Sequence, residues 1–244
     1  MSIGWLTPDW PAPPGVRALS TFRTGGTSAG RYESLNLGSH VGDDAAAVAE
    51  NRRCLAAAAK LPGEPCWLRQ VHGNEVADAD APAASNDASF THALGRVCAI
   101  LSADCLPVLF ASANAGVIGA AHAGWRGLAA GVLAATVRAM GERPSALIAW
   151  LGPCIGPLVY EVGSEVREAV LLEVPAAALA FVENSRGRFL ADLPLIARLQ
   201  LQALGVSRVH GGTECTFSQA DRYFSHRRDG QTGRQATLIW LEKP

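Results

Sequence analysis

The most constraining feature of the sequence is an uncharged stretch from Cys105 to Trp125, CLPVLFASANAGVIGAAHAGW. Its length alone would suit a membrane-spanning helix. A proline and several glycines interrupt it, however, and Val, Ile and Phe are prominent in its two short apolar runs. Proline breaks helices, whereas β-branched and aromatic residues favour strands. The stretch therefore predicts two buried strands, over residues 107–112 and 116–121.

The rest of the chain carries further strand and helix signals that do not alternate strictly. This mixture favours a mixed sheet, or packed sheets flanked by helices, over a strictly parallel doubly wound fold. The expected strands are 65–71, 97–102, 146–152, 207–212 and 236–242, and the expected helices are 45–60 capped by Asp43 or Asp44, 128–140, 165–174 capped by Ser164, and 193–204 capped by Asp192 and ended by Gly205.

Length and charge exclude several classes of protein. The chain has 244 residues, enough for a sizeable core, and we expect one catalytic domain over 1–244. Its net charge of −1 gives no basic field for a nucleic acid. The start lacks the basic and apolar regions of a secretion signal, which predicts a cytoplasmic protein. We also expect no membrane contact and no obligate protein partner.

The six cysteines predict reduced thiols rather than a disulfide framework, because the chain is large and its cysteines are widely spaced. Five of them are expected to act mainly as small buried apolar residues: Cys54, Cys66, Cys98, Cys154 and Cys215.

Three residues at the ends of predicted strands form a candidate site: His72 in QVHGN, Cys105 in SADCLP and His122 in AAHAGW. Two imidazoles and a thiolate suit zinc and leave a fourth position open. A nucleophilic Cys–His pair without metal is a second interpretation. Each residue could also be structural, and spacing alone does not separate these alternatives.

Several motifs follow one another from about Phe22 to Leu241: FRTGGTSAGRYESLNLGSHVGDD, QVHGNEV, ADCLPVLF, AHAGWRGLAAGVL, WLGPCIGPLVYEVG and CTFSQADRYFSHRRDGQTGRQATLIWL. Their order and residues resemble those of the YfiH-like family. Members of this family have been described as multicopper polyphenol oxidoreductases or laccases and as purine nucleoside phosphorylases.

The resemblance implies an α+β fold, a layered α/β/β/α sandwich with mixed sheets. It also implies zinc held by His72, Cys105 and His122, with copper as an adventitious substitute. The implied activity is phosphorolysis of purine nucleosides (adenosine and inosine, extending to guanosine and methylthioadenosine), with adenosine deaminase as a side activity. The implied ligands are a small-molecule nucleoside and phosphate.

Phosphorolysis requires an anion site and a surface for the base. Candidate phosphate ligands in the resembling motifs are Arg23, Arg126, Arg227 and Arg228, since a guanidinium binds phosphate in bidentate fashion. Asn36 and His40 are candidate substrate contacts, and Trp125, Tyr223 and Phe224 are aromatic residues that either stack on a base or fill the core.

Deamination requires a proton shuttle near the metal. Asp104 adjoins Cys105 and Glu75 follows His72 by three residues, and we favour Asp104 as a catalytic residue. Asp104 could equally orient a ligand.

Two other activities compete with this hypothesis. Cys105 with His72 or His122 would suit an amide hydrolase acting on a peptidoglycan precursor, as the resemblance also suggests. A copper-dependent polyphenol oxidase is disfavoured because the chain has only six histidines and no His-x-His pair.

Overall fold

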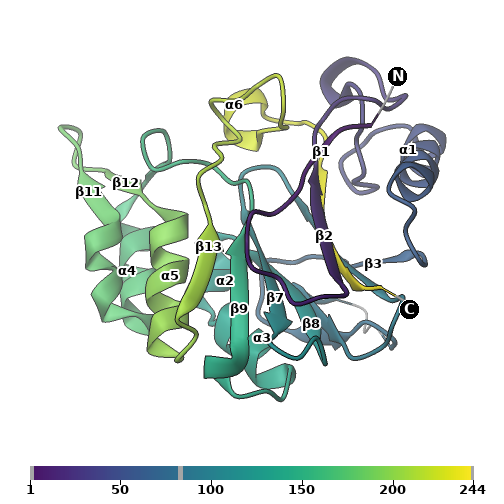
Figure 1. Ribbon diagram of the computed structural model, residues 1–244. Coiled ribbons are helices and arrows are strands. Elements are labelled where there is room, and N and C mark those ends of the chain that lie inside the picture. Colours follow the sequence, from purple (N-terminus) through teal and green to yellow (C-terminus); the bar gives the residue numbers. More distant parts are fainter. Residues whose placement is uncertain (1–2, 82–84, 243–244) are drawn as a thin grey trace.

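The computed structural model describes residues 3–81 and 85–242 of the chain. Two mixed β-sheets are stacked on one another, and helices lie outside them (Figure 1). The five-stranded sheet has the order β1-β2-β14-β6-β3, and the six-stranded sheet has the order β13-β9-β7-β8-β5-β4. A small third sheet, β10-β12-β11, stands beside them. This arrangement confirms the predicted layered α+β fold with mixed sheets.

The bounds of the elements are as follows. The strands are β1 (Trp5–Leu6), β2 (Val16–Thr21), β3 (Pro65–Trp67), β4 (Val76–Asp78), β5 (Ala88–Thr91), β6 (Val97–Ser102), β7 (Leu106–Ser112), β8 (Ile118–Ala123), β9 (Leu147–Leu151), β10 (Glu161–Val162), β11 (Phe181–Glu183), β12 (Phe189–Ala191), β13 (Arg208–Gly211) and β14 (Gln235–Leu241). The α-helices are α1 (Ala45–Ala58), α2 (Trp125–Ala129), α3 (Val132–Ala139), α4 (Ser164–Glu173), α5 (Leu193–Ala203) and α6 (His226–Asp229), and the 3-10 helices are η1 (Gly30–Tyr32), η2 (Pro144–Ala146) and η3 (Pro175–Ala180).

The central strands are mostly apolar, as expected for strands whose two faces are both buried. Along β6, Cys98 and Ile100 face the layer between the two sheets, where they join Leu109 of β7. The alternate residues of β6, such as Leu101, pack on the other side with Leu55 of α1. Because its side chains point alternately to either face, β6 contributes to two core layers.

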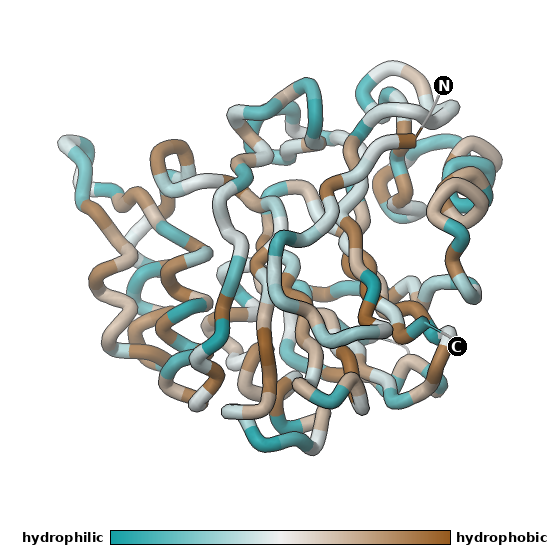
Figure 2. The backbone as a smooth tube through the Cα atoms, in the orientation of Figure 1, coloured by the Kyte–Doolittle hydropathy of each residue, from teal (hydrophilic) through white to brown (hydrophobic). Residues whose placement is uncertain are grey.

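A third core layer lies between the six-stranded sheet and the helices α2 to α5. Phe110 of β7 packs there with Leu133 of α3 and Ile196 of α5, all fully buried. Figure 2 shows hydrophobic and hydrophilic residues alternating along the turns of α4 and α5, the pattern of helices with one face against a core.

Most of the predicted strands are present. Residues 97–102 form β6 as predicted, and the two runs of the uncharged stretch form β7 and β8, which pair in antiparallel fashion. The expected strand at 65–71 is shorter, because β3 ends at Trp67 and the chain then leaves the sheet. The strands β1, β2, β4, β5 and β10 to β12 are not among the predicted strands.

The predicted helices need two corrections. The helix expected over 128–140 is two helices, α2 and α3, separated at Gly131, whose φ of 78° lies in the left-handed region. Gly163 rather than Ser164 occupies the N-cap of α4. The caps Asp44 and Asp192 are confirmed, since their carboxylates accept hydrogen bonds from Ala46 N and Leu195 N.

Among residues 3–81 and 85–242, no helix combines the length and apolar character that crossing a membrane requires.

Candidate functional site

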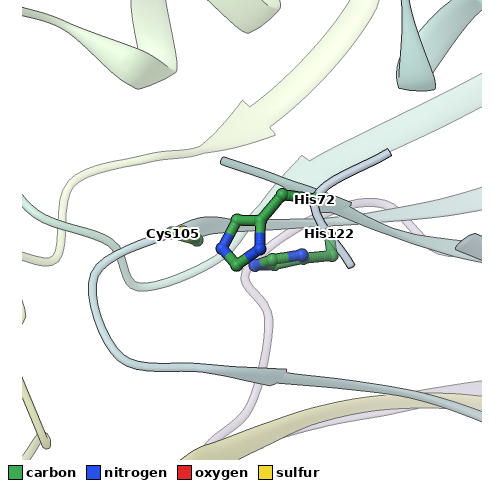
Figure 3. A group of neighbouring side chains, drawn as sticks. All are labelled: His72, Cys105 and His122. Carbon is green, nitrogen blue, oxygen red and sulfur yellow. The ribbon is translucent and has the colours of Figure 1, made fainter. Parts of the chain in front are cut away.

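Three side chains that the sequence singled out, His72, Cys105 and His122, meet in the folded chain. One ligand atom from each lies within 4.8 Å of the other two. Figure 3 shows the rings of His72 and His122 beside one another, with Cys105 next to them, on three separate segments. The ring centroids of the two histidines are 4.8 Å apart. Residues far apart in the sequence therefore form one potential ligand set.

Strand pairing explains why Cys105 and His122 are neighbours. Cys105 occupies the turn between β6 and β7, and Pro107 at the start of β7 pairs with His122 near the end of β8. His72 reaches the same place from the segment after β3, with a left-handed φ of 63°. The uncharged stretch thus supplies two of the three ligands as one β-hairpin.

Gly124 allows this close approach. A Cβ atom at Gly124 would lie 2.8 Å from the Cys105 Sγ, shorter than real contacts of this kind. A side chain at this position would therefore displace the thiol. This gives the glycine that follows AAHA a specific role in the site.

A buried carboxylate, Asp87, fastens both histidines. Asp87 Oδ1 accepts hydrogen bonds from His122 Nδ1 at 2.8 Å and from His72 N at 2.9 Å. Asp87 Oδ2 accepts from Gly73 N at 2.7 Å and Val71 N at 3.0 Å. Because His122 Nδ1 is engaged, its Nε2 is the nitrogen free to act as a ligand.

The charges of these groups stabilise one another. Burial raises the pKa of Cys105, but the charge of His122 and hydrogen bonds from His122 and His72 outweigh it and lower the pKa to about 6. Burial lowers the pKa of His122, but Cys105 and Asp87 together raise it to about 9. Cys105 is thus a thiolate at neutral pH, the form that binds metals.

This donor set fits a tetrahedral metal ion. Zn–S bonds of about 2.3 Å and Zn–N bonds of about 2.0–2.1 Å place tetrahedral ligand atoms roughly 3.3–3.6 Å apart. The ligand atoms here lie within 4.8 Å of one another, so small side-chain rotations would bring them to that spacing. A thiolate with two imidazoles suits zinc or a cuprous ion, and leaves one tetrahedral position open.

The three residues line a cavity of about 390 Å³, a size usual for small-molecule sites. Asp104 is the only carboxylate among its described lining residues, whereas several histidines and three arginines line it. The cavity is therefore cationic although the chain as a whole is slightly acidic, which suits an anionic ligand. The lining residues are His40, Gln70, His72, Leu101, Ser102, Ala103, Asp104, Cys105, His122, Trp125, Arg126, Tyr160, His226, Arg227 and Arg234.

Asp104 lies in the cavity wall with a left-handed φ of 92°. Its carboxylate accepts hydrogen bonds from Thr216 Oγ1 and from Arg227 N, both at 2.6 Å. These contacts tie the Cys105 turn to the carboxy-terminal segment and hold the carboxylate in one orientation.

Three of the predicted substrate contacts line the cavity: His40, Arg126 and Arg227. The Arg126 guanidinium lies 4.3 Å from the centroid of the Trp125 ring. The Arg227 guanidinium lies 5.1 Å from the centroid of the Tyr160 ring and donates to the Glu161 carbonyl at 2.8 Å. Both arginines are exposed.

The other three predicted contacts, Arg23, Asn36 and Arg228, are not among the cavity's lining residues. Arg23 donates to the carbonyls of Glu33 and Ala220, each at 3.1 Å. Asn36 is fully buried and bonds to backbone atoms of its own loop. These polar groups serve the fold around the site.

Arg228 likewise binds backbone carbonyls. It donates to Thr216 O at 2.7 Å, Phe217 O at 2.9 Å and Tyr223 O at 2.9 Å, and it pairs with Asp229. Its donors are therefore occupied within the carboxy-terminal segment.

The remaining candidates divide between the cavity and the core. Trp125 lines the cavity, whereas Tyr223 and Phe224 are fully buried core residues. Glu75 is exposed and does not line the cavity; its carbonyl oxygen accepts from Asp87 N.

Sequence reasoning missed several residues of the site. Tyr160, His226 and Arg234 lie in motifs that carried the family resemblance, but they were not assigned to the site. Asp87 was not assigned a role either. It lies directly before β5, a strand that the sequence did not predict, so no sequence signal marked it.

Comparison with known proteins is consistent with this geometry. Residues 17–242 match the family model described as multi-copper polyphenol oxidoreductase laccase. The chain is 52% identical over 240 residues to a purine nucleoside phosphorylase of Pseudomonas aeruginosa, covering 98% of each chain. It is 48% identical over 239 residues to purine nucleoside phosphorylase YfiH of Escherichia coli, covering 97% of this chain and 98% of that one.

Solved structures show the same fold. A crystal structure of a Neisseria meningitidis protein of the DUF152 family matches with a TM-score of 0.94 and 47% identity, over 98% of this chain and 99% of that one. YlmD from Geobacillus stearothermophilus matches with a TM-score of 0.92 and 35% identity, over 98% of this chain and 97% of that one.

Proposed function

Because the chain belongs to the YfiH family, whose model is described as multi-copper polyphenol oxidoreductase laccase, we propose that it is a zinc-dependent purine nucleoside phosphorylase. Adenosine, inosine, guanosine and methylthioadenosine form its substrate class, with phosphate as the second substrate. The site draws on residues between His40 and Arg234, which supports one catalytic domain.

The observation that carries the proposal is that His72, Cys105 and His122, here called the metal trio, lie in the wall of a cationic cavity. A nucleoside phosphorylase must hold a neutral nucleoside and an anion side by side, and stabilise positive charge at the sugar. The cavity offers aromatic surface at Trp125 and Tyr160 and guanidinium groups for the anion. The relatives named purine nucleoside phosphorylase support the same reaction class.

His72, Cys105 and His122 would hold the zinc ion. When bound, zinc acts as a Lewis acid and lowers the pKa of a coordinated water. The chain's own residues bind and orient the substrates. The aromatic rings contact the base, and the arginines bind phosphate.

Adenosine deamination is proposed as a side activity of the same site. It replaces the amino group of the base with oxygen from water and requires a residue that transfers a proton. Asp104 is the only carboxylate among the described lining residues, and its orientation is held by Thr216 and Arg227. We assign the proton transfer to Asp104.

Product analysis tests the function directly. The purified chain is incubated with inosine or adenosine, with and without phosphate, and the products are separated by chromatography. Phosphorolysis of inosine yields hypoxanthine and ribose 1-phosphate and requires phosphate, whereas hydrolysis would release free ribose. Absence of purine release under all of these conditions would overturn the proposal.

Variants assign the activity to the metal trio. Cys105→Ala and His122→Ala are expected to lose both zinc, measured by elemental analysis, and phosphorolysis. Cys54→Ala is the matched control, because Cys54 lies on α1 and does not line the cavity. Full zinc content with unchanged affinity in His122→Ala would remove that residue from the metal site.

A second candidate function is amide hydrolysis by the metal-free site. The Cys105 thiolate, the protonated His122 and the Asp87 carboxylate form the arrangement that activates cysteine nucleophiles. Cleavage of a peptide-like bond in a peptidoglycan precursor, lost in Cys105→Ala and independent of zinc, would favour this function.

Copper-dependent phenol oxidation fits the site poorly. A multicopper centre needs many imidazoles, and only two belong to the ligand trio. His92 binds the Gly116 carbonyl and His210 lies on β13. Slow oxidation with copper substituted at one site is the most that this arrangement supports.

A further inference from the structure

Arg234 is the least exposed of the three arginines in the cavity wall. It lies just before β14 and is partly buried, whereas Arg126 and Arg227 are exposed. A charge in a partly dehydrated position interacts more strongly with a bound anion than one at the surface. Arg234 should therefore bind an anion more strongly than the exposed Arg126 and Arg227 would.

The fold holds Arg234 in place through its backbone and stem. Asn36 Oδ1 accepts from Arg234 N at 2.9 Å, and Arg234 O accepts from Leu37 N at 3.0 Å. A Cβ atom at Gly38 would lie 2.8 Å from Arg234 Cγ, so only glycine leaves room for the stem. These contacts give the buried Asn36 a role: it positions Arg234.

The guanidinium of Arg234 has no ion-pair partner among residues 3–81 and 85–242. Its Nη1 donates to the carbonyls of Thr232 at 2.9 Å and Gly233 at 3.0 Å, and no described residue accepts from Nε or Nη2. Burial lowers the pKa of Arg234 below its usual value, and the nearby Cys105 and Asp104 partly offset that shift. Arg234 thus lies in the wall of the cavity that also holds the metal trio, with donors to spare.

Two other polar side chains of the cavity, His40 and Ser102, bear on what Arg234 can bind. His40 is close enough to Arg234 that the guanidinium lowers the pKa of His40, after burial as the main cause. The Ser102 hydroxyl is buried and has no hydrogen-bond partner in the described chain. Buried polar groups without partners are rare and indicate a polar ligand.

We propose that Arg234, with His40, forms the phosphate subsite of the cavity, and that the nucleobase lies toward Trp125 and Tyr160. This rests on the proposed phosphorylase function. The Arg234 donors that have no partner among the described residues would bind two phosphate oxygens, as guanidinium groups commonly do.

The reaction balances with this placement. A phosphate oxygen forms a bond to C1′ of the ribose while the C1′–N9 bond breaks. The electron pair of that bond leaves with the purine, which takes up a proton. The products are ribose 1-phosphate and the free base, and no oxidant or reductant is required.

Phosphate kinetics test the subsite. Arg234→Gln is expected to raise the KM for inorganic phosphate by about tenfold or more, because it removes charge-assisted hydrogen bonds, and to leave the KM for inosine within about twofold. Arg234→Lys should recover part of the loss, since it restores the charge without the planar fork. Arg138→Gln, on the exposed side of α3, is the matched control.

Direct binding separates this proposal from the proposed function. Titration of the zinc-loaded chain with inorganic phosphate alone, followed calorimetrically, should show binding that Arg234→Gln loses while keeping its zinc content and melting temperature. That result supports the subsite even if inosine is not cleaved. Normal phosphate binding in Arg234→Gln, with the loss found instead in Arg126→Gln or Arg227→Gln, would overturn the subsite.

Discussion

His122 Nδ1 donates to Asp87 Oδ1 across 2.8 Å, between two side chains that are almost completely buried. The same oxygen accepts from the backbone of His72, at 2.9 Å. The Asp87 carboxylate therefore fixes the ring orientation of His122 and holds the backbone of His72 in place. Partners of this kind raise the basicity of a ligating imidazole and fix its tautomer.

Asp87→Asn is expected to lower zinc affinity by roughly 10–100-fold, the usual effect of losing such a partner. An amide oxygen still accepts a hydrogen bond but carries no charge, and it is a weaker partner for His122. Competition with a chelator of known affinity measures the change. Asp78→Asn, at an exposed position on β4, is the control, and equal zinc affinity in both variants would contradict the role of Asp87.

The lowered pKa of Cys105 predicts its reactivity in the metal-free chain. Its folded-state pKa of about 6 lies below its ordinary 9.0, so the thiolate is present above pH 6 and is protonated as the pH falls through that value. The contribution of the Cys105 thiolate to stability is fully present above pH 9.0 and is lost as the pH falls through about 6. Alkylation by iodoacetamide should therefore rise with a midpoint near pH 6.

Cys54 provides an internal comparison for this titration. A hydrogen bond to the Glu50 carboxylate raises the pKa of Cys54 above 9.0, so its alkylation should increase only at alkaline pH. Mass spectrometry of the peptides separates the two sites. A Cys105 midpoint near 9 would mean that His122 does not stabilise the thiolate.

The sequence singled out the three side chains that cluster, but not the rest of the cavity. His72, Cys105 and His122 could be singled out because each follows or ends a strand that the sequence predicts, and reactive groups gather at strand ends. The two-residue strand β1 and the three-residue strands β11 and β12 are too short to show a period in the sequence.

Long-range contacts explain what the sequence could not reveal. Asp87 is distinguished only by reaching His122, 35 residues away, and Arg234 only by its contact with Asn36, 198 residues away. Arg228 and Arg234 both lie in the same arginine-rich motif, yet one binds carbonyls and the other faces the cavity. Residue type and spacing are similar, so tertiary contacts alone separate their roles.

Gly124→Ala is expected to weaken zinc binding without unfolding the chain. The added Cβ would lie 2.8 Å from the Cys105 Sγ, and relieving that contact moves the thiolate away from the two histidines. Zinc content after dialysis against a weak chelator measures the effect. Gly116→Ala, in the exposed turn between β7 and β8, should retain zinc; if Gly124→Ala retains it equally, the close approach is not required.

Arg228→Gln should affect stability rather than phosphate binding. Its guanidinium donates to the carbonyls of Thr216, Phe217 and Tyr223 and is largely buried, at 18% side-chain exposure. A hydrogen bond to a charged group contributes about 1.5–3 kcal/mol to stability. The glutamine amide can still donate to some of the carbonyls, so the variant does not lose the full contribution of all three hydrogen bonds. We expect the free energy of unfolding to fall by about 1–3 kcal/mol.

Urea denaturation of the zinc-loaded protein measures this loss, with Arg126→Gln as the comparison because Arg126 is exposed and stacks on Trp125. The KM for phosphate of Arg228→Gln should stay within about twofold of the wild-type value, since its donors point into the carboxy-terminal segment. A tenfold rise in that KM without loss of stability would instead place Arg228 in the phosphate subsite, because a variant that keeps its fold but loses phosphate has lost a ligand contact.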